Sequence, residues 1–74
     1  MANPTNPDHY RERGTEPIDV INTWGLNFNL GNVIKYVVRA EHKGNQELDL
    51  RKAIFYLEFE LFILGFGPDP RKKT

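Results

Sequence analysis

Three stretches of the chain pair recurring apolar residues with helix start and stop signals. In the first, Pro17 suits the first position of a helix and Gly25 is typical of a residue that ends one. Apolar residues recur there at three-residue spacing and are expected to face a core: Ile18, Ile21 and Trp24. We therefore expect a short first helix over residues 16–24, with Trp24 as a core anchor rather than a stacking surface.

The second stretch, residues 28–43, has the pattern of an amphipathic helix. Polar residues follow each other at spacings of three or four, which places them along one side of a helix: Asn32, Lys35, Tyr36, Arg39 and Lys43. Apolar residues occupy the opposite side: Val33, Ile34, Val37, Val38 and Ala40. The helix is expected to end near Lys43 and Gly44. Gly31, in its first turn, costs up to ~1 kcal/mol relative to alanine, so it serves either close packing or the approach of a ligand.

The third stretch begins after Asn45, a candidate cap, and is expected to end at Gly65. It predicts a helix of about 19 residues and ~28 Å, at ~1.5 Å per residue. From Ala53 onwards this helix is apolar on nearly all sides, and a helix that is apolar all round is buried all round. Two short partner helices cannot cover it. The pattern thus predicts an all-α, three-helix chain assembled as a homo-oligomeric bundle, with the third helix supplying much of the interface.

Composition agrees with one small domain. The 74 residues divide into an N-terminal arm (1–14), a helical domain (15–66) and a flexible basic tail (67–74). Ten basic residues balance ten acidic ones, which argues against duplex nucleic acid as a partner but leaves room for a small anion. The absence of cysteine fits a reducing cytoplasm. The apolar run from Ala53 to Phe66 is interrupted by Glu58 and Glu60, so we expect no membrane span.

The polar side of the second helix is the candidate site. It carries two or three cations one turn apart, beside the amide of Asn32 and the phenol of Tyr36. Such a set of side chains could bind a phosphate, and it could equally be an ordinary helix face exposed to solvent. Arg39 has a simple structural alternative, an ion pair with Asp49 on the next helix. His9 and Tyr10 in the arm either pack against and cap the helices, or fold across Lys35 and Arg39 to close a ligand site.

Several chemistries lack the residues they require. The sequence has no phosphate loop, no dinucleotide-binding glycine motif and no serine nucleophile. Two histidines without cysteine do not predict a zinc site, and no other metal or cofactor is expected. Glu58 and Glu60 lie two residues apart, on different faces of a helix, so they do not form the carboxylate pair that holds magnesium in helical nucleotide pyrophosphatases.

A set of motifs in this order resembles the SaV-like family of small, mostly phage-encoded proteins. The motifs are His9-Tyr10, EPIDVI at 16–21 ahead of Trp24-Gly25, GNVIKYVVRA at 31–40, and DLRKAIFYL at 49–57. The resemblance spans roughly His9 to Leu64. The family is related to a longer coliphage nucleoside monophosphate kinase that also lacks a phosphate loop. If the chain is phage-encoded, the host cytoplasm is its expected location.

The resemblance implies a nucleotide-related role. Its matching polar positions include the residues already selected by spacing and add three supporting residues: Asp49, Lys52 and Tyr56. We expect Lys35 and Arg39 to hold phosphate, Asn32 to orient the ligand, and Tyr10 or Tyr36 to stack on it. The favoured function is binding and sequestration of a nucleotide or another phosphate-bearing molecule, for example a host defence signal. The alternatives are a nucleotide kinase or hydrolase with Asp49 or His9 as base, and an inhibitor that binds a host protein.

Overall fold

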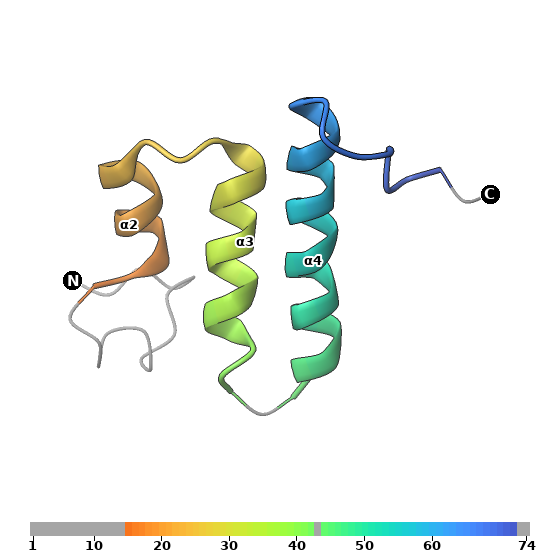
Figure 1. Ribbon diagram of the computed structural model, residues 1–74. Coiled ribbons are helices and arrows are strands. Elements are labelled where there is room, and N and C mark those ends of the chain that lie inside the picture. The colour runs from red at the N-terminus through yellow and green to blue at the C-terminus, as the bar shows by residue number, and fades with distance from the viewer. Residues whose placement is uncertain (1–14, 43, 73–74) are drawn as a thin grey trace.

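The structure is a computed structural model that describes residues 15–42 and 44–72. In this part of the chain it consists of three α-helices and no strand (Figure 1). The helices are α2 (Pro17–Trp24), α3 (Phe28–Arg39) and α4 (Gln46–Ile63). The all-α fold class and the three helices expected from the sequence are confirmed for the described residues.

Local signals in the sequence account for the junction between α2 and α3. Pro17 is the first residue of α2, and Glu16 and Asp19 form a reciprocal capping box at its start. Gly25 ends α2 in the left-handed region, at φ 66°, where glycine carries no steric penalty. Asn27 then caps α3, since its side-chain oxygen accepts a hydrogen bond of 2.9 Å from the Leu30 N–H.

The end of α3 differs from the expectation. The helix ends at Arg39 rather than near residue 43. The N–H groups of Glu41 and His42 bond carbonyls three residues back, at 3.2 and 3.1 Å, so the chain tightens into turns. The Gln46 side chain donates a 3.0 Å hydrogen bond to the Ala40 carbonyl, which supplies a partner that the next helical turn would otherwise provide.

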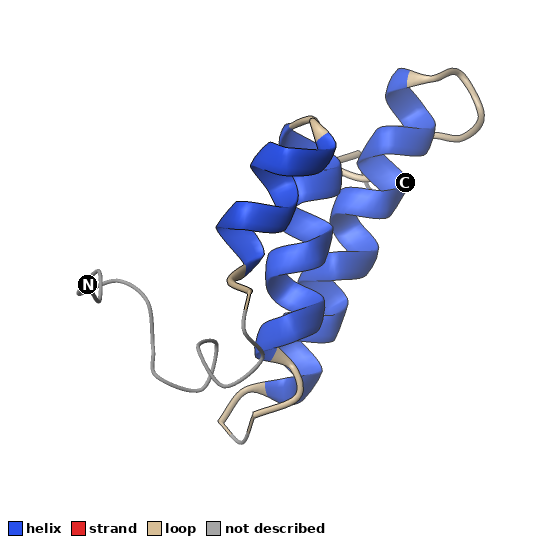
Figure 2. Cartoon of the chain, turned by 90° about the vertical axis from the view of Figure 1, so that its left-hand side faces the viewer, coloured by secondary structure: helices blue, strands red, loops and turns tan. Residues whose placement is uncertain are grey.

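The three helices lie side by side in one layer, in chain order. Figure 1 shows α3 between its two neighbours, and in Figure 2, turned by 90°, the helices largely overlap. The contact between α3 and α4 is extensive, and α2 packs on α3 over a smaller area. Stable domains usually bury their apolar faces between at least two layers of secondary structure. The described helices provide one layer, so no other described element covers either of its broad faces.

The core of the described chain is correspondingly small. Ala40 and Ala53 are its buried apolar side chains, and the buried polar residues are Asn29, Asp49 and Asp69. The expectation that Trp24 is a core anchor is wrong for this chain, because Trp24 is 67% exposed. Ile18, expected on the same core face, is also exposed. The physical reason is that, within the described residues, the main packing partner of α2 is a single helix, α3.

The exposure of α4 extends along its whole length. Its described apolar residues that remain at least 45% exposed are Leu48, Leu50, Ile54, Leu57, Leu61 and Ile63. The other described helices thus leave much of α4 exposed in a single chain, as the sequence pattern led us to expect. Coverage by further copies of the chain stays a prediction. Within residues 15–42 and 44–72, no helix is long and apolar enough to cross a membrane.

After α4 the chain turns at the end of the helix and runs out to one side of it (Figure 1). Asp69 accepts hydrogen bonds from Arg71 Nε at 3.0 Å, Nη2 at 2.8 Å and the backbone N–H at 2.9 Å. The Arg71 guanidinium lies 4.8 Å from the centre of the Phe59 ring on α4. This segment belongs to the stretch expected to be a flexible tail, and the structure gives it specific contacts that the sequence pattern did not indicate.

Candidate functional site

A pair of tyrosine rings joins α3 to α4. Tyr36 and Tyr56 stack with their centroids 5.9 Å apart and their planes 9° from parallel. Phe28, in the first turn of α3, meets Tyr56 edge-on at 6.0 Å and 76°. Offset-stacked and edge-to-face arrangements are the favourable geometries for aromatic pairs. These rings fix the relative position of two helices that carry the candidate polar side chains.

Three cations gather around the Tyr36 ring. Lys35 Nζ lies 4.6 Å and Lys52 Nζ 5.2 Å from its centroid, and Arg39 Cζ lies 5.5 Å away. Lys35 and Arg39 belong to α3, whereas Lys52 belongs to α4. Attraction between each cation and the ring quadrupole offsets part of the repulsion among the cations. We refer to Lys35, Arg39, Lys52 and Tyr36 below as the cation cluster.

One buried carboxylate touches the cluster. Arg39 Nε lies 3.9 Å from Asp49 Oδ1, at the outer limit of an ion pair. The ion pair that the sequence offered as an ordinary explanation of Arg39 is thus present. Yet the Arg39 side chain remains 50% exposed. Among the described residues, this one carboxylate pairs with a cluster of three cations, which leaves an excess of positive charge that an anion would neutralise.

A shallow hollow of about 190 Å³ adjoins the cluster. The residues that line it are Ile21, Asn27, Phe28, Gly31, Asn32 and Lys35. Gly31 is buried, and a Cβ added to it would lie 3.1 Å from Ile21 Cγ2, so glycine permits the close packing of α2 on α3. Of the two explanations for Gly31, close packing is the one that this contact supports.

The hollow and the cluster are continuous because Lys35 belongs to both. Asn32 lies on the hollow, with its side-chain amide held by a 2.9 Å hydrogen bond to the Phe28 carbonyl. The combined surface therefore runs from an apolar ring, past an amide, to a group of cations. Such a surface suits a molecule with an apolar end and an anionic end.

The structure brings together most of the residues chosen from the sequence. The described ones are Asn32 at the hollow, Lys35, Tyr36, Arg39, Lys52 and Tyr56 at or beside the cluster, and Asp49 behind Arg39. Predicted residues His9, Tyr10 and Lys43 lie outside the described residues. Sequence reasoning missed Phe28 as a site residue, although it precedes Asn32 by one helical turn and so shares its face.

Sequence reasoning also missed Glu60. Its carboxylate accepts hydrogen bonds from the side-chain amides of Asn27, at 2.9 Å, and Asn29, at 3.1 Å. These bonds hold the start of α3 against α4 and so position the hollow. The available signal in the sequence was a carboxylate within the apolar run of α4, a position it shares with Glu58.

No group of three or more His, Asp or Glu side chains that could hold a metal ion occurs in the described part of the chain. The absence of a metal from the protein stays a prediction.

Comparison with known proteins gives one family. A family model described as "protein of unknown function (DUF3310)" matches residues 4–58, about three quarters of the chain. The chain belongs to the DUF3310 family. The DUF3310 match includes α2, α3 and the part of α4 that carries Asp49, Lys52 and Tyr56, and it ends before Glu60. The curated proteins and the solved structures contain no match to this chain.

Proposed function

We propose that a homo-oligomer of this chain binds a nucleotide or another phosphate-bearing small molecule at the cation cluster and sequesters it without chemical change. The observation that carries the proposal is the convergence of Lys35, Arg39 and Lys52 on one tyrosine ring, at 4.6 to 5.5 Å. Cations that are held in place form hydrogen bonds to phosphate oxygens at a lower entropic cost than mobile ones.

The oligomer is part of the proposal for two reasons. A single helical layer leaves the apolar residues of α4 exposed, and a second copy of the chain would cover them. Moreover, the hollow measures about 190 Å³, whereas pockets for small molecules typically measure roughly 300–1,000 Å³. A site between chains would enclose more of the ligand than one chain does.

Two other functions remain alternatives. The nucleotide kinase or hydrolase would use the same cluster to stabilise transferred phosphoryl charge, with Asp49 or His9 as base. The inhibitor of a host protein would use the exposed apolar side chains instead. As part of this proposal, we place the chain with the SaV-like family of phage-encoded proteins. It would then counter a host defence signal, and it would act in the host cytoplasm.

The direct test is binding of nucleotides and inorganic polyphosphates, measured by calorimetry and by native mass spectrometry of protein purified from its host cells. We expect Lys35→Ala, Arg39→Ala and Lys52→Ala each to weaken binding about tenfold or more, because a hydrogen bond to a charged group contributes roughly 1.5–3 kcal/mol. Arg51→Ala is the matched control. Arg51 neighbours Lys52 in sequence, but its side chain is exposed and bonds Glu47 at 2.8 Å.

The outcomes separate the functional classes. Binding that is lost in the three cluster variants and kept in Arg51→Ala supports the proposal. Equal weakening by Arg51→Ala would show nonspecific charge attraction and contradict it. Turnover of any nucleotide by the purified protein would favour the enzyme, and the absence of binding to the whole panel would favour the protein inhibitor.

A further inference from the structure

We infer that the ligand of this site carries an aromatic heterocycle as well as phosphate, and that Phe28, rather than Tyr36, is the side chain that stacks on it. This inference rests on the proposed function and specifies its ligand class as nucleotides. It changes the role of Tyr36 from a stacking surface to a residue that organises the cations.

Tyr36 is poorly placed to accept a base. Its ring stacks on Tyr56 at 5.9 Å, and three cations lie within 5.5 Å of its centroid. A base that stacked there would displace the tyrosine partner or the cations that are to bind phosphate. The same side chain therefore does not serve both ends of the ligand.

Phe28 has the opposite surroundings. Its side chain lines the hollow and is 74% exposed, while the edge contact with Tyr56 at 6.0 Å fixes the ring. A fixed aromatic ring with an open surface is the arrangement by which proteins stack on bases, and stacking contributes roughly 1–3 kcal/mol per base.

The order of groups along the surface sets the orientation of the ligand. Phe28 lies at the apolar hollow, Asn32 lines the same hollow, and Lys35 connects it to the remaining cations. A hollow of about 190 Å³ is below the usual range for a whole ligand, so it fits a ring system while the phosphates extend to the cluster. Lys35 then meets the phosphate nearest the sugar, and Arg39 and Lys52 meet those farther along.

The experiment compares two anions that differ in the heterocycle. Calorimetry measures binding of inorganic tripolyphosphate and of a panel of nucleoside triphosphates to the whole chain. We expect the wild type to bind at least one nucleotide more tightly than tripolyphosphate. Phe28→Ala should weaken nucleotide binding about 5- to 150-fold, the equivalent of ~1–3 kcal/mol of stacking, and leave tripolyphosphate unchanged. Phe28→Trp should retain nucleotide binding.

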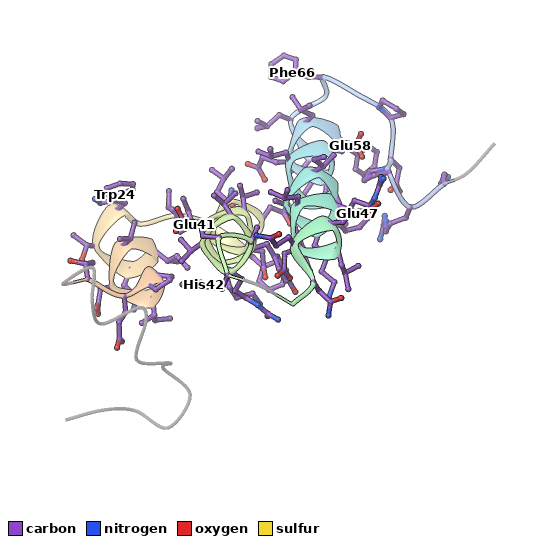
Figure 3. All side chains as sticks on the ribbon, turned by 90° about the horizontal axis from the view of Figure 1, so that it is seen from below. Trp24, Glu41, His42, Glu47, Glu58 and Phe66 are labelled. Atoms are coloured by element: carbon purple, nitrogen blue, oxygen red, sulfur yellow. The ribbon has the colours of Figure 1, made fainter. Side chains whose placement is uncertain are left out.

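Two further variants separate stacking from general damage. Phe66→Ala removes an aromatic side chain that is 75% exposed and does not line the hollow. Figure 3 shows Phe66 projecting away from the end of α4. This variant should bind nucleotides and tripolyphosphate as tightly as the wild type does. Tyr36→Leu should weaken both anions, because the cations lose the ring that gathers them. Sedimentation velocity of each variant checks that its assembly matches the wild type.

Each contrary result has a distinct meaning. If tripolyphosphate binds the wild type as tightly as every nucleotide, the inference fails while the proposed function stands. If Phe28→Ala weakens both anions equally, Phe28 acts through the fold and the inference also fails. If Tyr36→Leu removes only the preference for nucleotides, Tyr36 is the stacking residue. If no anion binds the wild type, both the proposed function and the inference are overturned.

Discussion

At the scale of single residues, Gly31 illustrates how closely α2 approaches α3. An added Cβ would lie 3.1 Å from Ile21 Cγ2, so the Ile21 side chain must shift by a few tenths of an ångström to accept it. We expect Gly31→Ala to change the free energy of unfolding by less than about 1 kcal/mol, since the gain in helix propensity offsets the contact. Gly31→Val should destabilise by about 1–3 kcal/mol through overpacking, measured by urea unfolding. A valine variant as stable as the wild type would contradict this packing.

Asp69 is the second residue whose environment makes a testable prediction. The side-chain and backbone hydrogen bonds from Arg71 lower the pKa of its carboxyl group from 3.8 to about 2. Because the folded-state pKa lies below the unfolded value, the contact stabilises the fold above about pH 4, and this contribution is lost as pH falls towards 2. A carboxyl titration followed by NMR should give the lowered value. Arg71→Ala should return the pKa towards 3.8, and an unchanged titration in that variant would refute the assignment.

At the scale of elements, Glu60 determines how the start of α3 meets α4. Its carboxylate accepts from Asn27 and from Asn29, and the latter is buried. Glu60→Ala removes both acceptors and leaves a buried amide without this partner, so we expect a loss of about 1–3 kcal/mol in unfolding free energy.

Glu58→Ala is the matched control for that experiment. Glu58 is an exposed carboxylate two residues away on the same helix, and its removal should change stability by less than about 0.5 kcal/mol. Thermal and urea unfolding of the two variants, at equal protein concentration, measure the difference. Similar losses in both would show that total charge on α4, rather than the two hydrogen bonds of Glu60, is responsible.

At the scale of the whole molecule, a single layer of helices with exposed apolar side chains predicts that the chain forms a homo-oligomer. Leu57 is 45% exposed in the single chain, so Leu57→Asp costs a monomer little, whereas an interface would bury an unpaired charge. We expect the wild type to sediment as an oligomer at micromolar concentration and Leu57→Asp to shift it to monomer or to unfold it. Glu58→Ala should leave the sedimentation coefficient unchanged. A wild-type protein that sediments as a stable monomer would exclude the oligomer and the shared site.

Local rules in the sequence determined where α2 begins and ends. Pro17 and Gly25 act within one or two turns of themselves, through φ restriction and a left-handed backbone, so their effect can be predicted without the fold. The three- and four-residue spacing of Lys35 and Arg39 placed them on one side of a helix for the same reason. The end of α3 was misjudged because Gln46, on the next helix, supplies a hydrogen bond to Ala40 from outside the local pattern.

Only the tertiary structure decided which helices meet and what the polar residues surround. Lys52 and Tyr56 reach Tyr36 across the contact between α4 and α3, and Glu60 reaches two asparagines more than 30 residues away in sequence. Such contacts depend on the packing angle and register of two helices, which periodicity leaves open. The exposure of Trp24 was likewise set by the single-layer arrangement and not by its spacing. The sequence by itself determined the helices and the face that carries the cations; tertiary packing decided that they gather around one ring.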